Sequence, residues 1–200
     1  MNWLEDIVDK CLEDMSNEKF LMMTCGKIPG EMLDTSIEPS DDWRGWKPIA
    51  SIITDEDINL LEKKIKYALP LSYRHFLKYK HFIHLRIPDI EVNLPNHLPD
   101  KNLTEILELV FNCNVPELVI GKGFIYFADF SDYGLLCFDA NETRENNEYP
   151  VVYIDHELGD VHLYANNFRD LLEADDEKGN RFIEKLNEYY RENDDSGGSG

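Results

Sequence analysis

Two hundred residues with 42% hydrophobic content are enough for one domain with a sizeable core, and they predict a single globular unit with an extension. Forty acidic residues against 20 basic ones give a formal net charge of −20, which would repel a nucleic-acid backbone and attract a positively charged protein, although solubility alone can also explain such charge. No apolar run approaches the roughly 20 residues that cross a bilayer, so no membrane segment is predicted.

The start of the chain and the cysteines predict a cytoplasmic protein. The opening MNWLEDIVDK is acidic and amphipathic, unlike the basic segment and continuous apolar block of a secretory signal. Cys11, Cys25, Cys113 and Cys137 are scattered and form no Cys-x-x-Cys pair. This spacing favours reduced thiols and gives no indication of zinc binding.

An amphipathic helix is predicted near the N-terminus, because apolar residues recur at helical spacing between Trp3 and Met15. It could be a dimerisation or partner-docking helix. Packing on its own domain is the favoured interpretation, since amphipathic helices usually face their own core. Residues 20–28 could form a short buried strand, and the Pro, Gly, Ser and acidic residues of 29–42 predict a loop.

Trp43 and Trp46 follow this loop. Two indoles so close to a turn could form a binding platform, because Trp is enriched at interface hot spots. The favoured alternative is that they hold the N-terminal extension against the next helices, since Trp has a large apolar area to bury.

Residues 53–78 predict two helices separated by a rigid corner. Thr54 can cap the first helix, in which apolar residues recur at helical spacing. Pro70 disfavours helical backbone at Leu69, so the first helix should end at that residue. Ser72 can then cap a second, shorter helix.

Beyond the corner, the apolar pattern changes from helical spacing to short runs. Residues 86–100 contain three prolines and predict loop or edge structure, whereas 103–111 predict a helix. Short apolar runs separated by turn residues then predict an antiparallel meander, and Asn167 and Asn180 can cap two final helices. The predicted runs are 118–120, 124–128, 135–138, 151–154 and 161–164. The fold class is therefore α+β, with about five or six antiparallel strands and helices packed around the sheet.

Short residue patterns of one kind of domain occur along the chain: Leu61-Glu62, Leu69-Pro70, Tyr73-Arg74, Phe76-Leu77, Ile120-Gly121, Ala128-Asp129, Gly134-Leu135, Phe138-Asp139, Tyr149-Pro150-Val151-Val152, and Phe168 with Leu171-Leu172. Together these patterns resemble the SUKH superfamily. The resemblance covers about residues 46–175, and it departs from the common pattern at Lys80-His81-Phe82, where an Asn-Gly pair usually follows the second helix. It implies an intracellular protein-binding domain that is not an enzyme. Many members are immunity proteins of bacterial toxin systems, and others are linked to cell-wall assembly and signalling.

The resemblance suggests three parts of the chain. Residues 1–45 form an N-terminal helical extension, and 46–192 form the SUKH-like domain. Residues 193–200 form a disordered tail, because they end in a Ser-Gly run of linker composition.

The histidines invite a test for metal or acid–base chemistry. His81 and His84 would share a helical face, with Asp89 and Glu91 nearby in sequence, but the intervening apolar residues equally describe a strand. No metal site is predicted, because no His-Glu-x-x-His or comparable spacing is present. No cofactor and no catalytic residue is predicted, since neither a placed nucleophile nor a phosphate-binding glycine motif occurs.

Acidic turns with aromatic residues between them are the candidate partner-binding site. The candidates, together with Trp43 and Trp46, are Asp129, Phe130, Asp132, Tyr133, Asp155, His156 and Glu157. In a simple up-and-down meander, alternate turns lie at the same end of the sheet, so the two groups could approach one another. Aromatic anchors inside an acidic rim suit a basic protein partner. The alternative is that these rings finish the core and the carboxylates cap turns.

The sequence thus predicts an immunity protein, a monomer or homodimer, that binds a basic toxin domain, which could be a nuclease. The alternative is a regulatory or scaffold module of the cell-wall or signalling type. A metal-dependent hydrolase using His81 or His156 is a third, disfavoured class.

Overall fold

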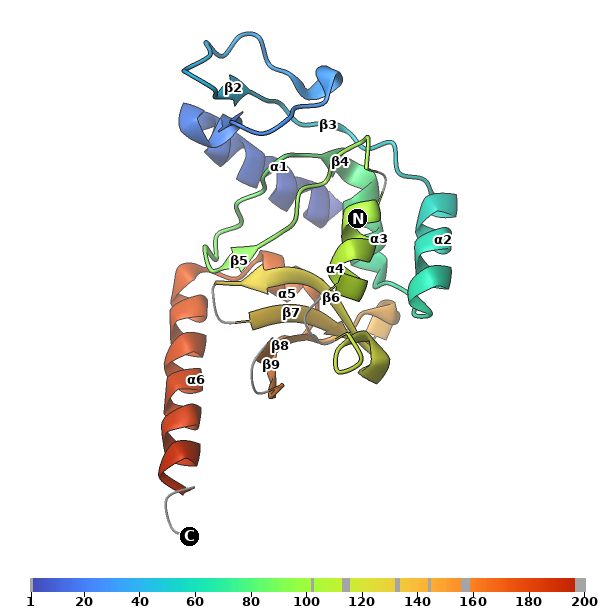
Figure 1. Ribbon diagram of the computed structural model, residues 1–200, viewed down its shortest axis with the longest axis vertical. Coiled ribbons are helices and arrows are strands. Elements are labelled where there is room, and N and C mark those ends of the chain that lie inside the picture. Colours follow the sequence, from blue (N-terminus) through green and yellow to red (C-terminus); the bar gives the residue numbers. More distant parts are fainter. Residues whose placement is uncertain are drawn as a thin grey trace.

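The main element of the fold is a five-stranded antiparallel sheet with the strand order β5-β6-β7-β8-β9 (Figure 1). The computed structural model describes residues 2–101, 103–112, 116–131, 134–143, 145–155 and 159–196. The predicted α+β class and meander are confirmed. The strands are β5 (Val92–Asn93), β6 (Phe124–Phe130), β7 (Gly134–Asp139), β8 (Val151–Asp155) and β9 (Val161–Ala165).

One predicted strand is wrong. Residues 118–120 lie in a turn that runs into the 3-10 helix Ile120–Lys122, where backbone N–H groups donate to carbonyls three residues back, as Lys122 does to Val119. Val119 is fully buried, which explains the apolar run without a strand. The fifth strand is instead β5, a two-residue edge strand within the region predicted as loop or edge.

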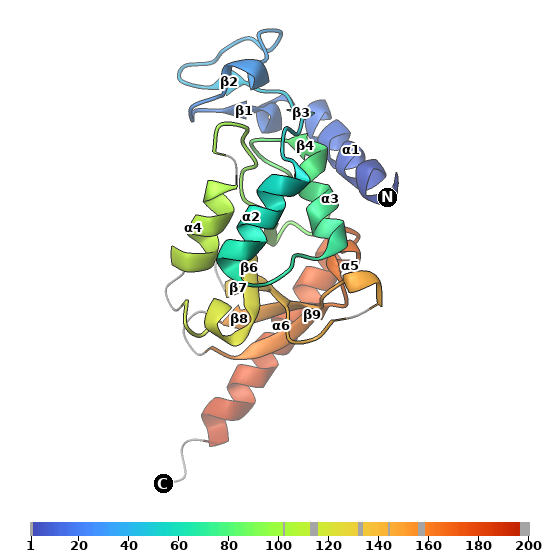
Figure 2. The same cartoon turned by 90° about the vertical axis from the view of Figure 1, so that its right-hand side faces the viewer.

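The helices lie on one side of the sheet and beside the ends of its strands (Figures 1 and 2). Figure 2 shows α2 and α3 side by side, with α1 next to α3 and α4 next to α2. The helices are α1 (Asn2–Asn17), α2 (Asp55–Ile65), α3 (Leu71–Tyr79), α4 (Thr104–Asn112), α5 (Phe168–Leu172) and α6 (Asp176–Ser196).

The start of α2 is as predicted, and its end is not. The Thr54 side chain accepts a hydrogen bond from the Asp57 N–H, and the Asp57 carboxylate accepts one from the Thr54 N–H, which completes a capping box. The helix stops at Ile65, four residues before Leu69, because Lys66 adopts a left-handed conformation with φ of 67°. The corner therefore begins one helical turn earlier than the proline indicates.

A distant glutamate caps α3, in place of Ser72. Pro70 occupies the N-cap position, and Ser72 lies inside the helix and is buried. Glu148 accepts hydrogen bonds from the Ser72 N–H (2.9 Å) and from the Ser72 hydroxyl (2.6 Å). A carboxylate at this end also complements the helix dipole.

Aromatic side chains form the centre of the core between α3, α5 and the sheet. Phe127 and Phe138 stack with ring centroids 4.0 Å apart, and Tyr73 lies 5.0 Å from Phe138. Phe168 follows the Asn167 cap of α5, which accepts a hydrogen bond from the Asp170 N–H as predicted. This cluster makes α3, α5 and the middle strands one packed unit.

The N-terminal helix packs on its own domain, which confirms the favoured interpretation. Its buried side chains, among them Leu4 and Met15, belong to the same hydrophobic core as the sheet. Its Asp9 accepts a hydrogen bond from Tyr79 at 2.8 Å. The predicted strand at 20–28 is mostly wrong, because Lys19–Met22 is a 3-10 helix and only Met23–Thr24 (β1) is extended.

Four very short strands form two pairs, one within the N-terminal extension and one directly after it. β1 pairs with β2 (Arg44–Gly45), and β3 (Ile49–Ala50) pairs with β4 (Lys80–His81), both in antiparallel fashion. β4 contains Lys80 and His81 of the Lys80-His81-Phe82 exit, so this departure from the family pattern pairs with the segment that follows the extension.

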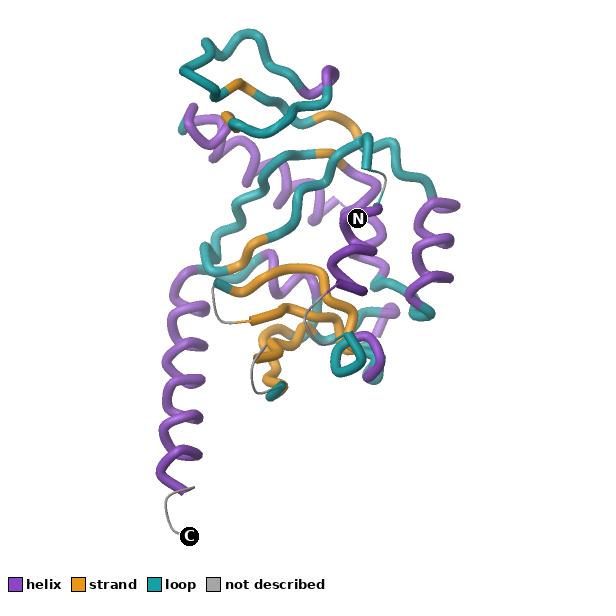
Figure 3. Tube along the Cα trace, in the orientation of Figure 1, coloured by secondary structure: helices purple, strands orange, loops and turns teal. Residues whose placement is uncertain are grey.

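The last helix is longer than predicted and projects away from the body (Figures 1 and 3). It begins at Asp176, after Asp175 accepts a hydrogen bond from the Lys178 N–H, and Asn180 lies inside it instead of capping it. It continues to Ser196, so the first four residues of the predicted tail are helical.

Candidate partner-binding surface

The two predicted acidic segments begin at the same end of the sheet, the turn end, where β6 and β8 stop. Gly134 of β7 pairs with Asp155 of β8, so the turns after β6 and β8 start at the same end of the sheet, as a meander requires. Four of the candidate residues lie outside the described residues. These are Asp132, Tyr133, His156 and Glu157, whose role in partner binding stays a prediction.

The two candidate carboxylates that the structure describes, those of Asp129 and Asp155, lie on opposite faces of the sheet. Asp129 is in register with Leu135, which is in register with Ile154, so these three side chains share one face. Asp155 follows Ile154 and therefore points to the other face, toward α6. The sheet separates Asp129 from Asp155, and a partner that contacts both must reach around its end.

Asp155 helps to hold α6 on the sheet. Its carboxylate accepts hydrogen bonds from the hydroxyls of Tyr190 (3.0 Å) and Tyr153 (3.5 Å). Burial and the Asp155 carboxylate raise the pKa of Tyr190, so its phenol stays protonated and remains the donor. Asp129 is exposed and accepts a hydrogen bond from Tyr126.

Two of the candidate aromatic residues belong to the core. Phe130 is fully buried, with ring contacts to Tyr164 (5.0 Å) and to Phe182 of α6 (5.6 Å). Trp46 is also fully buried. These side chains cannot contact a partner in this conformation, which corrects their listing as partner-binding residues and agrees with the alternative that such rings finish the core. Burial of their large apolar area is the physical reason.

Trp43 remains near the surface. It is partly exposed, and its ring lies 5.2 Å from that of Phe20, a residue that is 66% exposed. The indole therefore forms an outward aromatic pair on the N-terminal extension, far from the acidic turns in the fold. Its role as a partner contact stays a prediction.

The histidines named as possible metal ligands do not converge. One ring nitrogen of His81 accepts from the Ile52 N–H and the other lies 3.1 Å from the His97 carbonyl, whereas His84 is exposed beside Trp46. Asp89 is fully buried and accepts from the Tyr164 hydroxyl. In the part of the chain that the structure describes, no group of three potential ligands could hold a metal.

Much of this chain matches a known protein family. Residues 55–172, more than half of the 200-residue chain, match the family model SUKH_6, described as SMI1-KNR4 cell-wall. The chain belongs to the SUKH family. A search of curated proteins gives no match. Among the described helices, none is both long enough and apolar enough to cross a membrane.

Two helices that pack against the matched region lie outside it. α1 ends at Asn17 and α6 begins at Asp176, so both lie outside residues 55–172. The end of the sheet that carries Asp129 and Asp155 therefore lies within the family match. One of its faces is covered by α6, which lies outside that match.

Exposed apolar residues beside this end were missed by sequence reasoning. Tyr189 of α6 is 40% exposed, and its ring lies 4.8 Å from that of His162. On β9, Val161 and Leu163 are 45% and 54% exposed and share the face opposite α6. The alternation of Val161 and Leu163 was a usable signal. This alternation does not stand out in the sequence, because His162 and Tyr164 give the other face of β9 large ring side chains.

Proposed function

We propose that this SUKH domain is a non-enzymatic cytoplasmic protein that binds and neutralises a cationic toxin domain. One observation carries the proposal: the exposed Val161 and Leu163 of β9 lie on the same face of the sheet as the exposed carboxylate of Asp129, in a protein with a formal net charge of −20. The acidic charge would steer a basic partner, and Val161 and Leu163 would supply contact area that excludes water.

A nuclease is the toxin class that the charge suits best. Its nucleic-acid groove is lined with cations, and a surface of carboxylates can occupy the place of phosphates. Blocking the groove requires no chemistry from this chain, and a tight complex is sufficient.

The direct test is titration of the purified protein with the toxin domain encoded beside it, by calorimetry and by protection of cells that express the toxin. Leu163→Asp should weaken the complex by about tenfold or more if this surface is the interface. Leu60→Asp is the matched control, because Leu60 of α2 is also 54% exposed but lies elsewhere. Absence of both binding and protection across the cognate toxins would refute the proposal.

The family description supports a second candidate. Because the matching model is described as SMI1-KNR4 cell-wall, a regulatory or scaffold module of cell-wall assembly fits the same binding surface. Neighbouring wall or signalling genes, without a toxin reading frame, would favour this module.

A further inference from the structure

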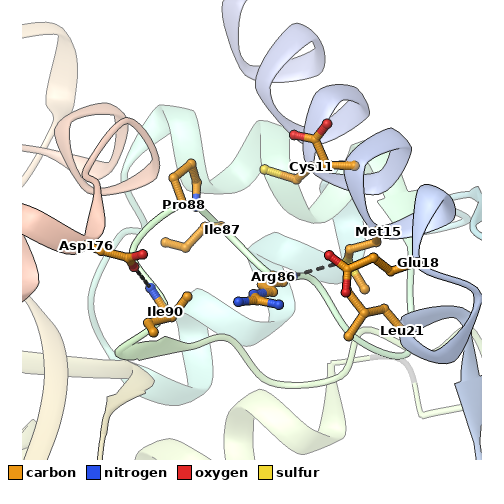
Figure 4. A pocket seen from close by; sticks show the side chains of 10 residues that line it. Cys11, Met15, Glu18, Leu21, Arg86, Ile87, Pro88, Ile90 and Asp176 are labelled. Atoms are coloured by element: carbon orange, nitrogen blue, oxygen red, sulfur yellow. Dashed lines mark hydrogen bonds between the residues drawn. The ribbon is translucent and has the colours of Figure 1, made fainter.

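A pocket of about 270 Å³ opens where α1, the segment leading into β5 and the start of α6 meet (Figure 4). Its floor is apolar and consists of Cys11, Met15 and Ile87, all buried. Leu21 is half-buried at the rim, and Ile90 is 49% exposed there. Such a cavity can take up an apolar side chain that is brought to it from outside.

The floor is chemically inert and can adapt in shape. Burial raises the pKa of the Cys11 thiol to about 11, so it stays protonated and is a poor nucleophile. The Met15 thioether accepts a hydrogen bond from the Arg86 N–H at 3.3 Å, which fixes its sulfur, while methionine in general fills irregular gaps. The pocket is thus suited to binding and not to covalent chemistry.

Carboxylates outnumber the single cation at the rim. Asp14 comes from α1, Glu18 follows the end of α1, Asp176 comes from α6, and Arg86 lies between them. The Asp176 carboxylate accepts a hydrogen bond from the Ile90 N–H at 3.0 Å, which ties α6 to the rim. The guanidinium of Arg86 forms no ion pair with any described residue. With three carboxylates against one guanidinium, the rim favours a positive charge.

The surroundings of the pocket strengthen this preference. The first 45 residues contain 11 acidic and 4 basic residues, a net charge of −7, and α1 presents part of this charge beside the pocket. A second hollow of about 350 Å³ shares Arg86 and Ile90 and continues along the segment toward Leu94. An extended segment of a partner could therefore follow both hollows, with Ile90 between them.

We propose that this pocket receives an apolar side chain of the protein partner that is flanked by a lysine or arginine in the partner's chain. The inference rests on the proposed function and adds a second contact to it. The apolar side chain covers Met15 and Ile90, and the flanking cation contacts Asp14 of α1 and Glu18, which follows α1. Because α1 and α6 lie outside the family match, this contact distinguishes the partner of this chain from partners of SUKH domains that lack these helices.

Arg86 provides a test with a definite sign. A cationic partner is repelled by the guanidinium, so Arg86→Gln should tighten the complex by several-fold, and it should do so more at low ionic strength. If the pocket instead holds an anionic group, the same substitution removes the only cation at its rim and weakens binding.

The experiment is calorimetric titration of the full-length protein and its variants with the toxin domain that the wild-type protein binds. Ile90→Ser should weaken binding by about tenfold. Ile52→Ser is the matched control, because Ile52 is 61% exposed and lies away from the pocket, and it should change affinity less than about twofold. Asp14→Asn with Glu18→Gln should weaken binding and reduce its salt dependence.

The outcomes separate the two proposals. If the toxin binds but Ile90→Ser behaves like Ile52→Ser, or if Arg86→Gln weakens the complex, the pocket inference is overturned while the proposed function stands. If Leu163→Asp is without effect and the pocket variants lose affinity, the pocket is the main interface. If no cognate toxin binds the wild-type protein, both proposals fail.

Discussion

His97 should make the protein lose stability in mild acid. The imidazole is 6% exposed and lies against His81 with ring centroids 4.5 Å apart. One ring nitrogen, Nδ1, lies 2.9 Å from the Lys80 carbonyl, and the buried Nε2 has no hydrogen-bond partner among the described residues. A proton on Nε2 would therefore be buried without an acceptor.

Burial lowers the pKa of His97 from 6.5 to about 4, so the folded protein resists protonation that the unfolded chain accepts. The stability is fully present above pH 6.5 and is lost as the pH falls toward 4. At 1.36 kcal/mol per pKa unit, the whole window corresponds to about 3 kcal/mol, most of which is lost by pH 4.5. The pKa of His81 is lowered too, mainly by burial, which acts in the same direction.

The measurement is urea unfolding between pH 7.5 and 4.5 for the wild-type protein and His97→Asn. Asparagine keeps an amide donor near the Lys80 carbonyl but cannot take up the proton. The unfolding free energy of the variant should therefore vary with pH by about 2–3 kcal/mol less than that of the wild type. Comparing the two proteins is necessary because the pKa of Asp89 is raised, mainly by burial, which gives a pH dependence of opposite sign.

Phe82→Leu is the control for loss of packing. Its ring lies 5.7 Å from that of His97 and has no titratable group, so the substitution should lower stability equally at every pH. An unchanged pH dependence in His97→Asn would refute the reasoning.

Two further substitutions test the contacts that hold the helices. Gly179→Ala, normally stabilising in a helix, should destabilise by about 1–3 kcal/mol, because the new Cβ would lie 2.5 Å from a carboxylate oxygen of the buried Asp89. Gly30→Ala, which meets nothing within 4 Å, is the control in thermal unfolding. Glu148→Ala should cost about 1–3 kcal/mol in urea unfolding, since it leaves the buried Ser72 without its hydrogen-bond partner, and a cost near zero would argue against this cap.

Local signals in the sequence were reliable where both partners lie within one helical turn. The Thr54 cap and the Asn167 cap each depend on a residue three positions later, and both are present as predicted. The end of α2 depends on a longer connection. Glu62 accepts hydrogen bonds from the Leu69 N–H (2.8 Å) and from Arg74 of α3 (2.7 Å), and so fixes the whole corner.

Gly179-Asn180 illustrates why a correct residue pattern can be given the wrong meaning. Next to a possible cap, a glycine indicates a helix boundary. In the structure, this glycine lies inside α6, where Asp89 occupies the space that a Cβ would fill. The constraint comes from a residue about ninety positions earlier, and no local pattern contains it.

The candidate site was predicted less well than the fold because a carboxylate in the sequence does not reveal its partner. Glu62, Glu148 and Asp155 all accept hydrogen bonds that join separate elements of the SUKH domain. Asp14 and Glu18 instead line a pocket and form no side-chain hydrogen bond or ion pair with the rest of the described chain. A carboxylate that accepts a hydrogen bond within the protein must give up that bond before it can bind a partner. A carboxylate that is only hydrated gives up water alone, so it binds a partner at a lower cost in free energy. The charge that selects a partner should therefore reside more in the α1 extension than in the acidic turns from which it was first inferred.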